Sequence, residues 1–195
     1  MLFRSKALEV YDEVEKQYNS LLEKRDNLNS EKDAVVSMMN EIESRKKELF
    51  MKSFNTINEN IRRIFLTLST KGEAHLFLEN EENPFDAGLR IRVRITGEKF
   101  LDIRSLSGGE KTMTALAFIF AIQEYNPASF YVLDEVDAAL DKRNSEKLSG
   151  LIKKYSEKAQ YIVISHNDAV ITEATTLYGV SMDENGASNV VSLKV

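Results

Sequence analysis

A seven-residue repeat of apolar side chains runs through the first 50 residues and constrains the fold more than any other feature. No Gly or Pro occurs before Gly72, so nothing in this stretch interrupts a helix. A second seam, four residues further along, mixes apolar with charged side chains. The pattern predicts a coiled coil that is not a symmetric homodimer, and an exposed amphipathic helix packed on its own domain is the alternative. The regular seam consists of Ala7, Val14, Leu21, Leu28, Val35, Ile42 and Leu49.

The apolar stripe becomes heavier and aromatic from Phe50 onward. A stripe of this kind is typical of a helix that docks on a globular core. We therefore expect a coiled-coil stub over residues 1–50 that runs into a compact domain over residues 51–195. The docking stripe consists of Phe50, Phe54, Ile57, Ile61, Phe65 and Leu68.

Beyond Gly72 the apolar period shortens and predicts strands over residues 74–78 and 89–95. The second strand alternates apolar side chains with Arg90, Arg92 and Arg94, which places the arginines on its outer face. These arginines are candidates for DNA contact, together with Lys99 and Arg104, although an ordinary solvated strand face has the same pattern. The side chains expected to face inward are Leu89, Ile91, Val93 and Ile95.

The remaining segments alternate between helix and strand. Helices are expected over residues 108–124 and 142–156, and apolar strands over residues 130–133 and 161–164. Two buried strands joined by a helix predict a right-handed parallel crossover, and hence an α/β fold with a mainly parallel sheet flanked by helices. A closing β-hairpin is expected around Asn185 and Gly186, with Val180 and residues 190–195 in its strands.

Composition limits the classes of function. Residues 1–72 carry 13 Lys/Arg and 12 Asp/Glu and are nearly neutral. Residues 73–195 carry 13 Lys/Arg and 19 Asp/Glu, so the whole acidic excess behind the net charge of −5 lies in the second part. An extended nucleic-acid-binding surface would be basic, and any DNA contact here must be local. Without cysteine the chain has neither a disulfide nor a thiolate metal site, and it has no apolar run long enough to span a bilayer. We expect no membrane partner.

The apolar strand that begins at Phe130 ends in Asp134 and Glu135. In α/β proteins, ligands bind at the carboxyl ends of parallel strands. Asp134 is suited to hold Mg²⁺, directly or through water, and Glu135 to orient or deprotonate an attacking water. Taken alone, Asp-Glu after an apolar strand is common and is more often structural.

The helix expected over residues 108–124 begins with two glycines. Gly108 and Gly109 allow backbone amides to approach a ligand, and Ser107 can cap the helix while presenting its hydroxyl. The N-terminus of a helix carries a partial positive charge and favours phosphate. A simple helix start without a ligand is the alternative.

His166 follows the strand over residues 161–164, and would lie beside Glu135 if the two strands are neighbours. A single His is more often a surface residue or one with satisfied hydrogen bonds. We interpret His75 in that way, because it lies on an apolar strand and we expect no acidic partner for it nearby in sequence. The order of the features is more specific than any one of them. A glycine helix start, Asp134-Glu135, Leu140-Asp141 and His166 follow one another along residues 104–168.

This set resembles the C-terminal lobe of ABC-type ATPases. On that resemblance, Leu106 to Glu110 match the signature motif and Asp134 and Glu135 the Walker B acids. Leu140-Asp141 match the D-loop, and His166 the switch histidine. The resemblance implies nucleotide contacts from Ser107, Gly108, Gly109, Glu110 and Asp141, catalytic roles for Glu135 and His166, and ATP with Mg²⁺ at Asp134.

The chain is similar, more narrowly, to the structural-maintenance-of-chromosomes (SMC) family. Residues 105–111, Ser-Leu-Ser-Gly-Gly-Glu-Lys, and residues 134–141, Asp-Glu-Val-Asp-Ala-Ala-Leu-Asp, lie behind a coiled coil. ABC transporters and the zinc-hook repair ATPase tend to have Pro where this chain has Val136. An ABC ATPase of DNA repair with a related fold, or a structural coiled-coil protein with an inactive head, are the alternatives.

A Walker A loop is missing from the sequence. None of the eight glycines is followed by Lys, as the motif requires. The resemblance places this loop far upstream in the same polypeptide, across a long antiparallel coiled coil. The chain is thus expected to hydrolyse ATP only together with that N-terminal half.

The resemblance further implies four partners: the N-terminal half, a second SMC head that dimerises when ATP is bound, a kleisin subunit, and DNA. It implies a cytoplasmic, chromosome-associated role in condensation, segregation or cohesion. The second head could be a copy of the same chain or a paralogue.

Overall fold

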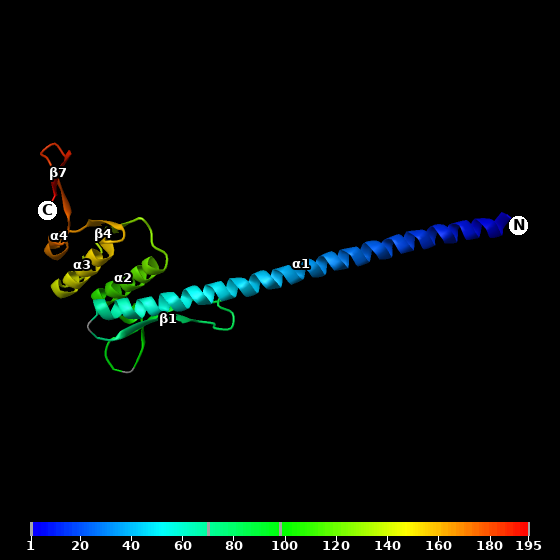
Figure 1. The fold of residues 1–195 in the computed structure, drawn as a ribbon, viewed down its shortest axis with the longest axis horizontal. Helices are drawn as coiled ribbons and strands as arrows, with labels where there is room; N and C mark the ends of the chain where they lie inside the picture. The colour runs from blue at the N-terminus through cyan, green and yellow to red at the C-terminus, as the bar shows by residue number, and fades with distance from the viewer. Residues whose placement is uncertain (1, 70, 98, 195) are drawn as a thin grey trace. The chain divides into compact units, whose positions relative to one another are not determined.

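The computed structural model describes residues 2–69, 71–97 and 99–194, with side chains from Val10 onward. Its first element, α1 (Leu2–Leu68), is a helix of 67 residues without interruption, as the lack of Gly and Pro predicts (Figure 1). The chain divides into two compact units, Met1–Met51 and Lys52–Val195, so that α1 contributes to both.

The seven-residue seam of the first unit is open to solvent. The side chain of Ala7 lies outside the described residues. The six that follow are each between 54% and 64% exposed. A helix of this length with an exposed apolar stripe needs a partner helix to bury it. The exposed seam residues are Val14, Leu21, Leu28, Val35, Ile42 and Leu49.

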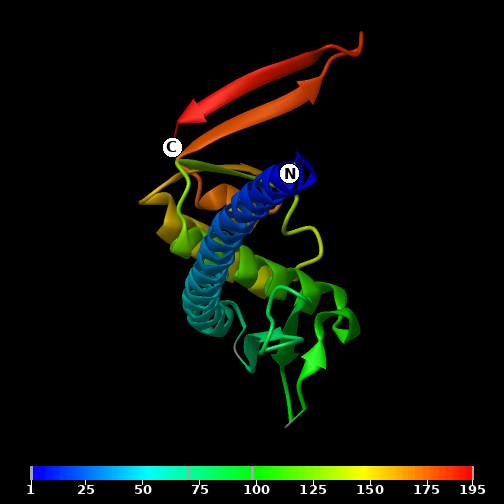
Figure 2. The ribbon, with the colours of Figure 1, turned by 90° about the vertical axis from the view of Figure 1, so that its right-hand side faces the viewer.

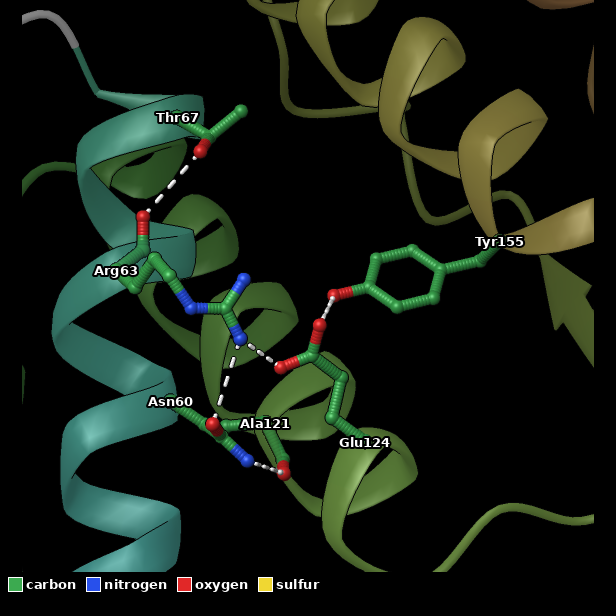
Figure 3. Close-up of polar contacts among 6 residues, drawn as sticks. All are labelled: Asn60, Arg63, Thr67, Ala121, Glu124 and Tyr155. Atoms are coloured by element: carbon green, nitrogen blue, oxygen red, sulfur yellow. Dashed lines mark hydrogen bonds and ion pairs between the residues drawn. The ribbon is translucent and has the colours of Figure 1, made fainter.

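The end of α1 packs into the second unit, as the aromatic stripe predicts. Ile61, Phe65 and Leu68 are buried in the core, and Ile64, which the stripe did not include, is buried with them. Polar contacts add to this docking, and Figure 3 shows a group that joins α1 to two later helices. The Nζ of Lys147 also donates to the carbonyl of Leu68 at 2.9 Å and caps the last turn of α1.

Three strands then form an antiparallel sheet in the order β1 (Glu73–Leu78), β2 (Leu89–Arg94) and β3 (Leu101–Asp102). The first two agree with the predicted strands, while β3 and the short 3₁₀ turn η1 (Ile103–Ser105) were not expected. Val93 is buried, and Ile91 and Ile95 are partly buried against the core. Leu89 is 42% exposed, contrary to expectation, because it pairs with Leu78 at the open loop end of the hairpin.

The second half of the chain alternates as expected through α2 (Gly108–Tyr125), β4 (Phe130–Asp134), α3 (Lys142–Ser156) and β5 (Gln160–Ile164). β4 and β5 pair in parallel, which confirms the predicted α/β crossover. A five-residue helix, α4 (Asp168–Thr172), follows and was not predicted. Phe120 of α2 stacks on Tyr155 of α3 and on Tyr161 of β5, so the two helices pack on one face of the strand pair.

The other face of β4 and β5 is not covered. We expected buried strands, but of the first four residues of β4 only Leu133 is buried, and Phe130 and Val132 are 59% and 56% exposed. Ile162 and Ile164 of β5 are also exposed, at 46% and 51%. Alternate residues of a strand point to opposite faces, so covering one face with α2 and α3 leaves these four side chains in solvent.

β6 (Thr176–Met182) and β7 (Ser188–Lys194) close the described chain as an antiparallel hairpin, as predicted around Asn185 and Gly186. Gly186 adopts φ 81°, the left-handed conformation that such a turn requires. The two strands lie side by side over their whole length (Figure 2). Val195, which the prediction placed in this hairpin, lies outside the described residues.

Candidate functional site

β4 and β5 bring the two candidate catalytic residues to the same edge of the sheet. Their register pairs Asp134 with Ile164, and the Glu135 N–H continues the ladder to the Ile164 carbonyl at 2.9 Å. Glu135 therefore leaves β4 directly beside the point where the chain continues to His166. The predicted neighbouring strands are confirmed, and the catalytic roles of the two residues stay a prediction.

Asp134, Glu135 and His166 are all exposed, and within the described chain none of the three side chains has a hydrogen-bond or ion-pair partner. Glu135 adopts φ 46°, the one left-handed conformation of a non-glycine residue in the described chain. Such a conformation costs on the order of 1–2 kcal/mol and is common at functional sites. The main-chain turn here thus determines where the carboxylate is presented.

Mg²⁺ would be held at this edge by Asp134. No cluster of three or more His, Asp or Glu side chains able to bind a metal lies within the described ranges. In nucleotide sites Mg²⁺ takes one or two carboxylates together with substrate phosphates and water, rather than a cage made by the protein alone. One free carboxylate at the carboxyl end of β4 fits that requirement.

The start of α2 has the geometry of a capped but accessible helix N-terminus. The Ser107 N–H donates to Glu110 Oε2 at 2.9 Å, and the Glu110 N–H donates to Ser107 Oγ at 3.5 Å, which forms a capping box. Glu110 is thus engaged within the helix start, while the Ser107 hydroxyl keeps its own proton for a ligand. A Cβ atom at Gly108 would meet no atom within 4 Å, so the backbone there is open.

The turn after β4 lies against this helix start. A Cβ atom at Gly109 would come within 3.3 Å of the Ala139 carbonyl oxygen, so the predicted signature motif lies against the residue that directly precedes the predicted D-loop. Asp141 closes the turn as the N-cap of α3, and its Oδ1 accepts the Asn144 N–H at 2.8 Å. The nucleotide contact predicted for Asp141 would therefore add to a structural role.

Behind the exposed acids lies a buried polar group that the sequence analysis missed. Asp137 is only 5% exposed, and its Oδ2 accepts the Ser165 hydroxyl at 2.6 Å. Asn167 donates from its Nδ2 to Ser145 Oγ at 2.9 Å, and Ser145 is fully buried. Asp137 lies between Glu135 and Asp141 in sequence. The proposed chemistry uses only Asp134 and Glu135, so the extra carboxylate in this turn was the signal that could have pointed to a structural role.

The outer face of β2 carries the three arginines proposed for DNA contact, and two of them are engaged by acids. Arg90 pairs with Glu79, and its hydrogen bond lowers the pKa of that carboxyl. Arg94 pairs with Glu73. The guanidinium carbon of Arg92 lies 4.9 Å from the centroid of the Phe77 ring, an arrangement that leaves its hydrogen-bond donors free.

The region holds three further basic or imidazole side chains. Lys99 and Arg104 are exposed on either side of β3. His75 lies 3.3 Å from a Glu73 carboxylate oxygen and packs edge-on against Phe100. The expectation that no acid lies near His75 was wrong, because Glu73, two residues before it, points to the same face of the strand. The interpretation of His75 as an ordinary structural residue stays a prediction.

The chain resembles curated proteins over nearly its whole length. It is 45% identical over 190 residues to the chromosome partition protein Smc of Pyrococcus furiosus and 34% identical over 189 residues to that of Bacillus subtilis. Each alignment includes 97% of this chain, which spans only 16% of the length of these relatives.

Solved structures agree with the fold. An Smc head domain with an extended coiled coil, from Pyrococcus furiosus and bound to the C-terminal domain of ScpA, aligns with a TM-score of 0.87 at 44% identity. It covers 97% of this chain and 47% of its own. The Smc head domain with a coiled coil and joint from Pyrococcus yayanosii aligns with a TM-score of 0.88 at 45% identity. That alignment covers 97% of this chain and 36% of the other. A third structure, from work on ATP-driven dimerisation and DNA-stimulated activation of SMC ATPases, aligns with a TM-score of 0.69 at 45% identity. It covers 76% of this chain and 89% of its own.

Among the described residues, none of the helices combines the length and apolar character that crossing a membrane would require. The family model described as the RecF/RecN/SMC N terminal domain matches residues 13–189. With that match and the head structures above, the chain belongs to the RecF/RecN/SMC family and is a fragment of an SMC-type ATPase head.

Proposed function

We propose that this chain is the C-terminal half of an SMC head, and that it hydrolyses ATP only when the N-terminal half of the same protein completes the site. One observation carries this proposal. The parallel pair β4–β5 delivers Asp134, Glu135 and His166 to one edge, while the face of that pair opposite α2 and α3 has no covering layer.

Parallel strands in α/β proteins are normally covered on both faces. Here four apolar side chains on the outer face are roughly half exposed, and a contiguous patch of this kind marks an interface. The sequence also lacks a phosphate-binding loop with its Lys. A lobe that adds strands beside β4–β5 and covers this face would supply both missing parts. The exposed seam of α1 would pair with a helix of that same N-terminal half. The patch consists of Phe130, Val132, Ile162 and Ile164.

In the completed head, the N-terminal lobe would cradle the phosphates of ATP, and Asp134 would hold Mg²⁺, which neutralises charge on the β- and γ-phosphates. Glu135 would orient the attacking water and accept its proton, because its carboxylate is free and lies at the end of the strand. His166 would contact the same water or the γ-phosphate from the neighbouring strand end. Turnover would then require the loops after β4 and β5, which carry Glu135 and His166, to keep their relative position.

The start of α2 would act on the ATP of a second head. Ser107 and Gly108 are exposed and Gly109 is partly exposed, and the amides of a helix N-terminus favour a phosphate, so these residues would cap the γ-phosphate across a head–head interface. Asp141 would lie at the same interface, since Ala139, two residues before it, lies against the start of α2. Hydrolysis would remove the shared phosphate and let the heads part, which would move the coiled coils.

Further partners follow from the relatives. One related head is bound to ScpA, and another is described with DNA-stimulated activation. We extend both properties to this chain, as a kleisin partner and a DNA partner in chromosome partition. Of the three arginines proposed for DNA contact, Arg92 is the best placed, because acids pair with Arg90 and Arg94.

Two variants of the complete protein test the assignment. Glu135→Gln should abolish turnover and preserve ATP-dependent dimerisation, because it removes the base but keeps the size of the side chain. Ser107→Arg should block dimerisation without weakening ATP binding to a single head. Unchanged turnover in the first variant would refute Glu135 as the base, and loss of ATP binding in the second would refute capping in trans.

A further inference from the structure

Asp137 connects the turn after β4 to the loop after β5. Its carboxylate is buried, and it accepts the Ser165 hydroxyl at 2.6 Å. The Ser165 Oγ in turn accepts the Asn167 N–H at 2.9 Å. One carboxylate therefore holds the residues on both sides of His166. A short O–H···O⁻ bond of this type is about twice as strong as a bond between neutral groups.

The same loop is anchored a second time, to α3 and α4. The side chain of Asn167 donates to Ser145 Oγ at 2.9 Å and accepts the Ala169 N–H at 3.1 Å. Ser149 Oγ donates to the Ala169 carbonyl at 2.7 Å. No buried side-chain nitrogen or oxygen lacks a hydrogen-bond partner in the part of the chain that the structure describes. A network so fully satisfied is rigid, and loss of one member frees the others.

The side chain of His166 itself is exposed and contacts no other polar group within the described ranges. Its position relative to Glu135 is therefore determined by the main chain on either side of it. On the Glu135 side, the turn continues with the Ala138 N–H bonded to the Glu135 carbonyl at 3.1 Å, directly after Asp137. Together with the bond from the Glu135 N–H to the Ile164 carbonyl, the bond between Asp137 and Ser165 closes a ring that contains Glu135. His166 follows Ser165 directly and is spanned by the bond from the Asn167 N–H to Ser165 Oγ.

We propose that Asp137 and Ser165 are positioning residues for hydrolysis, which hold Glu135 and His166 at one water molecule. The inference rests on the proposed function. A displacement of about 1 Å at a reacting group can cost on the order of 100-fold in rate. Because the Asp137 carboxylate is buried and bonded to the Ser165 hydroxyl, we expect neither side chain to contact the nucleotide, so their loss should lower the rate of the chemical step and leave nucleotide binding unchanged.

The test measures kcat and KM for ATP in the full-length protein. Asp137→Ala and Ser165→Ala should each lower kcat by about 10- to 100-fold, with KM within about two-fold of the parent. The double variant should be no slower than the slower single variant, because both remove one bond. Ser165→Thr and Asp137→Asn keep the hydroxyl donor and an oxygen acceptor, and should restore kcat to within about five-fold.

A matched control separates this role from general stability. Ser156 Oγ also donates a 2.7 Å hydrogen bond, to the Lys153 carbonyl at the end of α3, so Ser156→Ala should leave kcat and KM unchanged. If Asp137→Ala fails to fold, Ser165→Ala decides the matter, because Ser165 is only partly buried.

The outcomes distinguish the two proposals. If Glu135→Gln abolishes turnover while Ser165→Ala keeps kcat within two-fold of the parent, the positioning role is refuted and the proposed function stands. A rise in KM with kcat unchanged, or additive losses in the double variant, would also refute it. If Glu135→Gln itself turns over normally, the proposed function fails first.

Discussion

Glu124 joins three helices and offers a sharp test of what holds the last turns of α1 within the second unit (Figure 3). Its Oε1 accepts the hydroxyl of Tyr155 on α3 at 2.6 Å, and its Oε2 pairs with Arg63 on α1. Tyr155 is only 9% exposed, whereas the Arg63 side chain is 54% exposed. The buried phenol and not the ion pair should therefore dominate the energy of this contact.

The magnitudes follow from burial. A hydrogen bond to a charged group is worth about 1.5–3 kcal/mol, and Glu124→Ala also leaves the buried Tyr155 hydroxyl without an acceptor. An ion pair with an exposed Arg is worth about 0–1 kcal/mol. We expect Glu124→Ala to lower the free energy of unfolding by about 2–3 kcal/mol and Arg63→Ala by less than about 1 kcal/mol. Glu124→Gln keeps the oxygen acceptor and should cost about 1 kcal/mol or less.

Urea denaturation of the complete head measures these differences at constant slope. The expected order of destabilisation is Glu124→Ala, then Glu124→Gln, with Arg63→Ala close to the parent. A larger loss for Arg63→Ala than for Glu124→Ala would refute the reasoning, because the exposed ion pair would then outweigh the buried hydroxyl.

Three further predictions concern pH, docking and the backbone. Burial, and then the hydrogen bond to Glu124, raise the pKa of Tyr155, so its contribution to stability is complete below about pH 10 and declines above it. Tyr155→Phe should reduce that alkaline decline by up to about 1.4 kcal/mol per pH unit in denaturation at pH 9–11. Val132→Glu on the uncovered face should abolish binding of the N-terminal half in a pull-down. Leu89→Glu, at another exposed apolar position, should not, and unchanged binding by the Val132→Glu chain would argue against that face. Gly72→Ala should lower the free energy of unfolding by more than about 3 kcal/mol, because φ is 89° and the new Cβ would lie 1.9 Å from the Arg94 carbonyl oxygen. Gly97→Ala, at φ 77°, would meet no atom within 4 Å and should lower it by about 1–2 kcal/mol in the same denaturation assay.

Much of the fold was predictable because local signals coincide with tertiary ones. The bounds of α3 agree with the prediction, since Asp141 caps its start and the chain behind it is strongly amphipathic. β4 and β5 were recognisable as apolar runs, and Gly186 marked the hairpin turn. The site residues could be proposed from their order along the chain, because motif order determines which strand ends they occupy.

The remaining features depend on contacts that local sequence does not encode. β3, η1 and α4 have two, three and five residues, too few for a period to appear. The exposure of Phe130 and Val132 reflects which elements this chain provides to cover its sheet, and an apolar strand reads the same in either case. The bond between Asp137 and Ser165 joins residues 28 positions apart and appears only once β4 and β5 are paired.

The central claim is that this chain provides half of an ATPase site, and mixing the two halves tests it most directly. ATP hydrolysis should be absent from this chain alone and from the N-terminal half alone, and should appear when the two are combined. Combination with the Glu135→Gln chain should give an inactive head that still dimerises when ATP is added. Turnover by this chain alone at the rate of the mixture, or a stable mixture that neither hydrolyses ATP nor dimerises with it, would contradict the account.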